Sequence, residues 1–361
     1  MSQPSAAAFQ TALADCRLEG LDAAAAEALE FIGLEPSSAG PRARLRSAIP
    51  LQGIVPRLAE ALAGRVGIPG LSLGVETRVG ASSRRAGVEA LERVANVIAV
   101  ASGKGGVGKS TTAVNLALAL AAEGARVGLL DADIYGPSQQ LMLGIPEDRQ
   151  PTVRDGKFFE PVMAHGLQTM SMGYLLTEKT PVVWRGPMAS GALQQMLTQT
   201  LWHDIDYLVV DMPPGTGDIQ LTLAQKVPVS GAVIVTTPQD IALLDCRKGI
   251  EMFRKVDIPV LGVVENMAVH ICSACGHAEH LFGAGGGERV AKGYGVPLLG
   301  SLPLDIRIRE QTDGGTPTVV AEPGGALAAS YRAIARGTAL ALLRRQRSAP
   351  ATGPVITISN D

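Results

Sequence analysis

The chain has 361 residues, of which 46% are hydrophobic and 4% aromatic, and its formal net charge at pH 7 is −2. This length exceeds that of an average domain, so we expect two domains, with an aliphatic core of the kind that parallel sheets build. The small net charge gives no electrostatic reason to expect a nucleic-acid partner.

Residues 1–80 predict a small α+β domain. The composition favours helix from residue 6 to 32, and the spacing of apolar residues predicts a second helix over 55–66. Polar and apolar residues alternate over 71–79, which is typical of a strand with one buried face. The small and polar stretch 81–95 is expected to be a linker.

From residue 96 to 345, short apolar runs alternate with segments that favour helix. These runs predict buried strands at 97–102, 126–133, 207–214, 232–238, 260–267 and 297–303. The alternation predicts an α/β fold with a mostly parallel central sheet flanked by helices. Ligands of such sheets bind at the carboxyl ends of the strands. Residues 346–361 contain proline and serine and are expected to form a flexible tail.

The first of these strands leads into a phosphate-binding loop pattern, GKGGVGKST. The residues of this loop are Gly103, Lys104, Gly105, Gly106, Val107, Gly108, Lys109, Ser110 and Thr111. Closely spaced glycines let successive backbone N–H groups surround phosphate oxygens, and the N-terminus of the following helix favours an anion. Lys109 is expected to neutralise the β- and γ-phosphates of ATP, and the Ser110 hydroxyl to reach Mg²⁺. The additional Lys104 is typical of a subset of the proteins with a phosphate-binding loop, and members of this subset usually work as nucleotide-driven dimers.

Acidic residues end two of the predicted strands. Asp131 and Asp133 follow the second run, where one carboxylate could orient an attacking water and the other could support the magnesium shell. The alternative is a capping aspartate at the start of the next helix. We favour the functional interpretation over the capping one, and we expect Asp133 to position the attacking water. Asp211 ends the third run and suits an aspartate in the second coordination sphere of Mg²⁺, ahead of a glycine-rich loop that changes conformation with the γ-phosphate.

A Cys-x-x-Cys turn at Cys272 and Cys275 places two thiolates on one side of a loop, ready for a soft metal. Two thiolates leave a four-coordinate site half complete. A second copy of the chain would supply the other two, and such a homodimer could hold a [4Fe–4S] cluster or a zinc ion. The flanking histidines could substitute as ligands, but a surface role is favoured for each: His270, His277 and His280. A thioredoxin-type redox role is a weaker alternative.

The other two cysteines, Cys16 and Cys246, are isolated and are expected to pack as small hydrophobic residues. Four cysteines are too few for a disulfide scaffold, which favours a reducing cytoplasm. The N-terminal residues lack the basic and apolar segments of a signal peptide, and no apolar run reaches the roughly 18 residues of a membrane span. We therefore expect a cytoplasmic protein without stable membrane association.

Five motifs occur in the order GKGGVGKSTT, DADIYGPS, DMPPGTGD, ENM and CSACGH. Together they resemble the Mrp/ApbC family of P-loop ATPases, the iron–sulfur cluster carriers, over roughly residues 95 to 340. WRGPM at 184–188 and DCRKGI at 245–250 also look like family segments, although the family more often has alanine where Cys246 stands.

The resemblance implies a role for individual residues. Lys104 would reach across a dimer to the partner's nucleotide, while Lys109, Ser110 and Thr111 would hold the triphosphate and Mg²⁺. Asp133 would lie in the first switch and residues 211–218 in the second. The adenine would be contacted by Asn266 and wrapped by the segment containing Pro303. Cys272 and Cys275 would bind the bridging cluster.

The N-terminal segment resembles, in part, a small domain that often precedes this ATPase and is related to cytosolic iron–sulfur assembly factors. Ile49 stands where that domain commonly has a cysteine, so we interpret this segment as a degenerate docking or structural module.

The resulting hypothesis is an ATP hydrolase that carries a [4Fe–4S] cluster at a homodimer interface and passes it to apo iron–sulfur proteins, with slow ATP hydrolysis. Two alternatives stay open. One is a positioning ATPase of the septum-site or partitioning type, which would use the mildly amphipathic helix predicted near 326–345 at a membrane. The other is a zinc-bridged dimer without cluster transfer.

Overall fold

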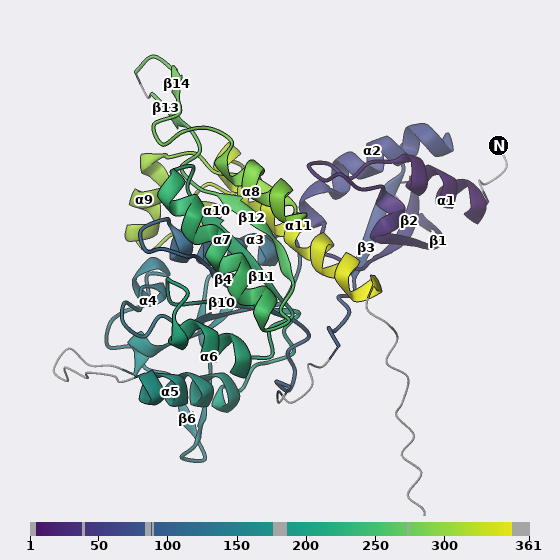
Figure 1. Ribbon diagram of the computed structural model, residues 1–361. Coiled ribbons are helices and arrows are strands. Elements are labelled where there is room, and N and C mark those ends of the chain that lie inside the picture. The colour runs from purple at the N-terminus through teal and green to yellow at the C-terminus, as the bar shows by residue number, and fades with distance from the viewer. Residues whose placement is uncertain are drawn as a thin grey trace, which may run out of the picture.

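The computed structural model describes residues 5–37, 40–83, 88, 90–175, 186–272 and 274–348. A sheet of eight strands forms the larger body, and a sheet of three strands forms a smaller one beside it (Figure 1). Two short two-stranded ribbons project from the larger body: β6 (Val153–Arg154) with β7 (Phe158–Phe159), and β13 (His270–Ile271) with β14 (Ala278–Glu279).

The smaller body is built from the N-terminal residues. Its elements are α1 (Ala6–Asp15), β1 (Leu29–Ser37), β2 (Gly40–Ser47), α2 (Val55–Val66) and β3 (Ser72–Thr77). The strand β2 pairs antiparallel with β1 and parallel with β3, and both helices pack on the same sheet. The helix predicted over 55–66 and the strand predicted over 71–79 are both present.

The helix-rich composition from residue 6 to 32 predicts helix, but the structure has an α-helix only in the first part of this segment. The helix α1 ends at Asp15, and residues from Leu29 onward form the edge strand β1. Pairing with β2 explains the difference, because it satisfies the backbone of this segment and lets Phe31 stack on Phe9 with ring centroids 4.3 Å apart.

The larger sheet has the strand order β15-β12-β11-β4-β10-β5-β9-β8. All neighbouring pairs are parallel except β9 and β8, which are antiparallel. The strands are β4 (Val97–Ala101), β5 (Val127–Asp131), β8 (Val162–Ala164), β9 (Leu167–Ser171), β10 (Tyr207–Asp211), β11 (Gly231–Thr236), β12 (Val260–Glu265) and β15 (Leu298–Ser301). The six predicted strands are all in this sheet, while β8 and β9 were not predicted.

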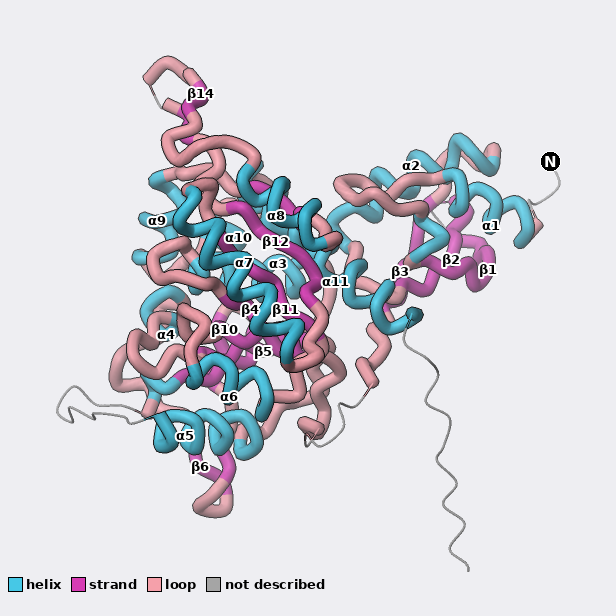
Figure 2. The backbone as a smooth tube through the Cα atoms, in the orientation of Figure 1, coloured by secondary structure: helices cyan, strands magenta, loops and turns pink. Residues whose placement is uncertain are grey.

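Helices cover both faces of this sheet (Figure 2). The helices are α3 (Lys109–Ala122), α4 (Gln139–Met142), α5 (Gly186–Gln199), α6 (Asp218–Lys226), α7 (Asp240–Lys255), α8 (Gly286–Tyr294), α9 (Ile306–Asp313), α10 (Thr318–Ala321) and α11 (Ala326–Ser348). On one face α3 is buried between the sheet and α11, and its alanine-rich sequence permits this close packing. The chain therefore has the predicted α/β fold, with the small α+β unit before it.

The last helix, α11, joins the two bodies. The guanidinium of Arg344 near its end pairs with the carboxylate of Glu27, with Nε to Oε1 at 2.5 Å. About two turns earlier, Arg336 donates to the buried carboxylate of Glu123 at 2.6 Å. Glu123 also accepts from the backbone N–H of Gly53 at 2.8 Å. Within the described part of the chain, no helix has the length and apolar character that crossing a membrane requires.

Candidate functional site

The phosphate-binding loop connects β4 to α3 at the carboxyl ends of the parallel strands. Gly106 and Gly108 have φ angles of +81° and +80°, which residues with a side chain adopt only at a cost. At Gly103 a Cβ would lie 2.1 Å from the carbonyl oxygen of Asp245 in α7, so only glycine fits there. Three of the glycines in the motif are thus explained by backbone geometry, and the loop has the cradle that a polyphosphate needs.

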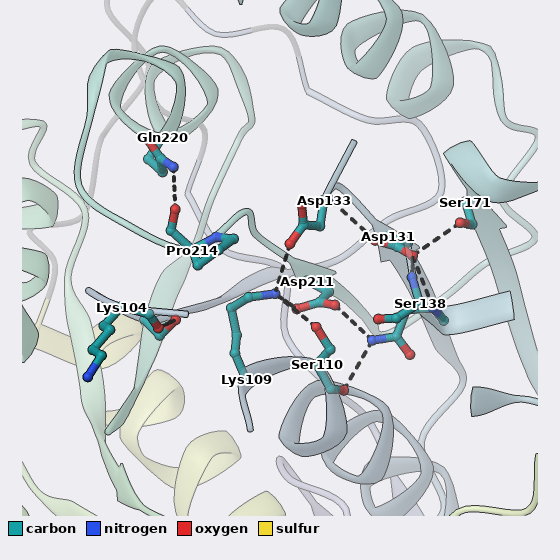
Figure 3. A network of polar contacts seen from close by, with 12 residues as sticks. Lys104, Lys109, Ser110, Asp131, Asp133, Ser138, Ser171, Asp211, Pro214 and Gln220 are labelled. Atoms are coloured by element: carbon teal, nitrogen blue, oxygen red, sulfur yellow. Dashed lines mark hydrogen bonds and ion pairs between the residues drawn. The ribbon is translucent and has the colours of Figure 1, made fainter. Parts of the chain in front are cut away.

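Lys109 points into a buried acidic group (Figure 3). Its ammonium donates to the Ser110 hydroxyl at 3.0 Å and forms an ion pair with Asp211. A second carboxylate, that of Asp133, lies 4.0 Å from the ammonium nitrogen. The structure therefore brings together four of the predicted site residues around one point, at the N-terminus of α3.

Asp131 has a different environment from Asp133, two residues later. Its fully buried carboxylate accepts hydrogen bonds from the backbone N–H groups of Asp133, Ser138 and Gln139, at 3.0 to 3.1 Å, and from the Ser171 hydroxyl. These contacts occupy both oxygens, so Asp131 fixes the loop that carries Asp133. Burial raises the pKa of the Asp131 carboxyl, and the nearby Asp211 raises it further.

Asp133 is the carboxylate that faces Lys109. Burial raises the pKa of its carboxyl above the ordinary value, and the Lys109 charge opposes that rise. A buried carboxylate beside the phosphate cradle can hold a water molecule through a hydrogen bond, which is the geometry that hydrolysis of a phosphoanhydride requires.

Gln139, the first residue of α4, belongs to the same network and was not predicted. Its amide nitrogen donates to Asp211 Oδ2 at 2.8 Å and to the carbonyl oxygen of Ser110 at 3.1 Å. A glutamine after a Pro-Ser pair has no sequence signal that distinguishes it from a surface residue. Only its burial between the two loops reveals the contact.

Asn266 and Pro303 lie at the carboxyl ends of neighbouring strands, β12 and β15. The Asn266 amide donates to the carbonyl oxygen of Val107 at 2.9 Å, so its contact in this structure is with the phosphate-binding loop. Pro303 is half-buried beside it, because the backbone of Leu302 pairs with Glu265 at 2.8 Å. The adenine contact expected for both residues stays a prediction.

The remaining loop residues are more open. Lys104 is exposed, and its ammonium points away from the group around Lys109 (Figure 3). Thr111 is half-buried in the first turn of α3. In the loop after β10, the N–H of Gly215 donates to the Ser102 carbonyl at 2.9 Å, which ties this loop to the end of β4.

The Cys-x-x-Cys turn is the tip of the hairpin formed by β13 and β14, which projects from the body (Figure 1). The N–H of Cys272 donates to the His277 carbonyl at 2.9 Å, and the N–H of Gly276 donates to the Cys272 carbonyl at 2.8 Å. Cys275 is exposed and Cys272 is partly exposed. Hydrogen bonds from the backbone N–H groups of Ala274 and Cys275 lower the pKa of the Cys272 thiol, which favours the thiolate that a soft metal binds.

The histidines near this turn have other partners. His270 contacts the carbonyl oxygen of Leu304 at 3.2 Å, and His280 contacts that of Ala268 at 2.8 Å. His277 is exposed, with its Nε2 3.9 Å from Glu279. The described residues contain no group of three or more potential metal ligands, so this hairpin offers two thiols and no further ligand.

Cys16 and Cys246 are both buried, in the positions expected of small hydrophobic residues. Burial raises the pKa of the Cys246 thiol to about 12. The helix α11, which the membrane alternative would need, has its apolar residues packed against α3, β12 and β15. That apolar surface is therefore already covered by the protein itself.

A comparison with protein families matches residues 93–339 to the family described as ParA, NUBPL iron-transfer P-loop NTPase. The iron-sulfur cluster carrier protein of Pseudomonas fragi is 65% identical over 269 residues, which is 74% of this chain and 94% of that protein. The protein of the same name from Escherichia coli K12 is 66% identical over 67% of this chain and 65% of its own length. The mouse iron-sulfur cluster transfer protein NUBPL is 51% identical over 72% of this chain and 80% of its own.

Solved structures show the same fold. A nucleotide-binding protein from Archaeoglobus fulgidus, in complex with ADP, has a TM-score of 0.56 and 38% identity and covers 62% of this chain and 88% of its own. The cell division ATPase MinD of Pyrococcus furiosus has a TM-score of 0.50 at 24% identity, covering 67% of this chain and 97% of its own, and is similar in fold alone.

Proposed function

Because the chain belongs to the ParA/NUBPL iron-transfer P-loop NTPase family, we propose that it is an ATP-dependent iron–sulfur cluster carrier. In this proposal two copies of the chain hold a [4Fe–4S] cluster between them and transfer it to apo iron–sulfur proteins. The observation that carries the proposal is the hairpin tip, where Cys272 and Cys275 are accessible and no third ligand lies nearby among the described residues.

The two thiols of one chain supply half of the four ligands that a [4Fe–4S] cluster takes. A two-fold axis through the hairpin tips would bring the other half from an identical surface of the second copy. The projection of the hairpin from the body supports this arrangement, because it places the tip away from the larger sheet (Figure 1). The cluster is the cargo of this site, so its ligands must release it as well as bind it.

The phosphate-binding loop fits Mg²⁺ and ATP. The positive φ angles of Gly106 and Gly108 are typical of a loop whose backbone N–H groups surround phosphates. Lys109 is the buried cation that would bind them, and the Ser110 hydroxyl would be the metal ligand. When bound, Mg²⁺ neutralises charge on the phosphates. Asp211 would orient the water shell of the ion, and Asp133 would hold the attacking water. Lys109, now paired with Asp211 and Asp133, would exchange these carboxylates for phosphate oxygens.

Lys104 completes the site from the other subunit in this proposal. Its exposed ammonium has no role in the network around Lys109, which suits a residue that binds across an interface (Figure 3). Nucleotide would then alter the dimer by binding its closed and open states with different affinity, since only differential affinity can shift an equilibrium. Hydrolysis would be slow and coupled to the release of the cluster.

We also propose that residues 1–80 form a domain of their own, joined by a linker at 81–95 to the ATPase domain of 96–345. Ile49 is fully buried in the smaller body, and Cys16 is buried too, so this domain presents no thiol for cluster chemistry. It would act as a docking or structural module. The residues assigned to a flexible tail, 346–361, lie outside the described residues except for the end of α11. The accessible thiols suit a reducing compartment, and we place the carrier in the cytoplasm.

Anaerobic reconstitution with iron and sulfide tests the carrier proposal. The full chain should bind four iron and four sulfide per dimer and develop the brown absorbance of a cluster, because the four thiolates of two chains complete the ligand set of one [4Fe–4S] cluster. Cys272→Ala and Cys275→Ala should each lose it, while Cys246→Ala, which changes a buried thiol remote from the hairpin, should keep it. Unchanged absorbance in either hairpin variant would refute the proposal. Zinc without sulfide, bound by the same two cysteines, would instead support the zinc-bridged dimer.

A further inference from the structure

One buried side chain beside the phosphate-binding loop has an unused hydrogen-bonding atom. Gln139 is 1% exposed, and its backbone N–H donates to Asp131 at 3.0 Å. Its side-chain nitrogen donates to Asp211 Oδ2 at 2.8 Å and to the Ser110 carbonyl oxygen at 3.1 Å. The side chain therefore connects the first switch to the end of β10 and to the first turn of α3.

These two bonds settle the orientation of the amide. Both of the partners are acceptors, so the reverse orientation would place Oε1 against a carboxylate and a carbonyl oxygen. The oxygen Oε1 must therefore face away from them. It is buried and has no hydrogen-bond partner among the described residues. Buried acceptors are satisfied in most proteins, and an exception calls for an explanation such as a ligand or an ion with its water.

The place of this orphan acceptor indicates which ligand would satisfy it. Gln139 contacts Ser110 and Asp211, the residues expected to serve Mg²⁺ directly and through water. Mg²⁺ dehydrates reluctantly and keeps several waters in nucleotide sites, and these waters are strong hydrogen-bond donors. Two side-chain donors in this network, the Lys109 ammonium and the Ser171 hydroxyl, bond to Ser110, Asp211 and Asp131 and not to Oε1. A donor that arrives with the ligand would satisfy it.

We propose that Gln139 is a positioning residue of the magnesium–nucleotide site. Its Nε2 holds Asp211 in place after Lys109 has moved to the phosphates, and its Oε1 accepts a hydrogen bond from the water shell of Mg²⁺. This inference rests on the nucleotide site of the proposed function and adds a residue to it. Partners of this kind, which orient a metal ligand without binding the metal, commonly change metal affinity by about 10- to 100-fold when they are removed.

Calorimetric titration of the full chain with ADP, in the presence of Mg²⁺ and again in EDTA, separates this role from packing. The measured quantity is the ratio of the two affinities. Gln139→Met removes both polar atoms at similar volume, and it should reduce the ratio by about 10-fold or more while the affinity in EDTA stays within about two-fold. Gln140→Met is the matched control, because the neighbouring side chain bonds to Pro146 instead and should leave the ratio unchanged.

Gln139→Glu keeps an acceptor oxygen and loses the amide donor. If the water shell of Mg²⁺ is the partner, the glutamate variant should retain more of the magnesium effect than the methionine variant. A purely structural role predicts the reverse order, because a second carboxylate against Asp211 disturbs the fold more than methionine does. Thermal unfolding without nucleotide measures that disturbance separately, and the order of the two ratios can be read even if both variants lose stability.

An unchanged magnesium effect in Gln139→Met would overturn the inference and leave the nucleotide site intact. Failure of the unmodified chain to bind ADP under either condition would instead refute the nucleotide half of the proposed function, and the inference with it.

Discussion

Two aspartates that are separated by one residue do different work in this protein. Asp131 is enclosed by backbone N–H groups and fixes the loop, while Asp133 faces Lys109 at the phosphate cradle. From the sequence we assign the attacking water to Asp133, and that role stays a prediction. The loop-fixing role of Asp131 leaves no local pattern, because it depends on the side of the loop on which the N–H groups converge. The same applies to Gln139, whose role depends on partners more than 25 residues away in the chain.

Replacement of each aspartate should separate these roles. Asp133→Asn should lower ATP hydrolysis by about 100-fold or more, since positioned carboxylates contribute about 10² to 10⁴, and should leave the free energy of unfolding nearly unchanged. Asp131→Asn should cost about 1–3 kcal/mol of stability, because an amide group turns a donor toward N–H groups. Steady-state hydrolysis and urea unfolding measure the two effects. Equal loss of hydrolysis at equal stability in both variants would contradict the assignment.

The cysteines should differ in reactivity according to their surroundings. The lowered pKa of Cys272 gives a thiolate at lower pH than in a free cysteine, whose pKa is about 8.5, so alkylation at pH 7 should begin there. Burial raises the pKa of Cys246 to about 12, so that thiol stays protonated throughout the neutral range. The same burial shields it from the reagent. Mass spectrometry after iodoacetamide treatment of the metal-free protein tests this. Labelling of Cys246 before urea is added would show that its environment is open.

At the scale of elements, α3 connects two sites. Its first turn carries Lys109 and Ser110. Glu123, the residue that caps its C-terminal end, accepts hydrogen bonds from Arg336 of the last helix and from Gly53 of the smaller body. Glu123 is fully buried, and at Gly53 a Cβ would lie 2.5 Å from its Oε1, so the approach of the two bodies requires glycine there. From the sequence alone, a glutamate that is followed by Gly124 would be taken for an exposed residue at the end of a helix.

The pair formed by Glu123 and Arg336 should be strongly coupled. Glu123→Ala should destabilise the protein by about 3–5 kcal/mol, because it leaves a buried guanidinium without a partner. Removing both side chains should cost less than the sum of the single changes. Arg344→Ala is the matched control: its ion pair with Glu27 is half exposed and should contribute about 1 kcal/mol or less. Additive effects at Glu123 and Arg336, measured by urea unfolding, would argue against a coupled pair.

At the scale of the whole molecule, both proposed sites need a second copy of the chain. The cluster site needs its two thiols, and the nucleotide site needs its Lys104. Both features lie at the surface of one copy, the hairpin tip as two exposed thiols and Lys104 as an exposed cation. No group of three or more potential metal ligands completes the thiol site among the described residues, and Lys104 points away from the group around Lys109 (Figure 3). A dimer explains both with one symmetric interface.

Lys104→Ala should therefore impair hydrolysis without weakening the binding of ADP to a single chain. A cation supplied in trans contributes on the order of 10³ or more to phosphoryl transfer, so we expect a loss of at least about 100-fold. The affinity for ADP should stay within about two-fold, because the residue points away from the cradle of its own subunit. Lys255→Ala, an exposed lysine at the end of α7, serves as the control. Undiminished hydrolysis by the Lys104 variant would remove the reason for a trans-acting lysine.

The sequence by itself determined the parallel sheet and its phosphate-binding loop. Buried strands of such a sheet are short apolar runs, and the loop depends on neighbouring residues, so both leave local patterns. It did not reveal β1 and β9, which contain polar or glycine residues, or β8, which has only three residues. All three owe their conformation to pairing with other strands. Tertiary structure alone decided that Asp131 faces the loop backbone, that Gln139 joins the site, and that Glu123 joins the two bodies. The hydrogen bonds of Gln139 and Glu123 join distant segments, and those of Asp131 depend on how the following loop folds back onto it. The residue types involved are equally common on exposed surfaces.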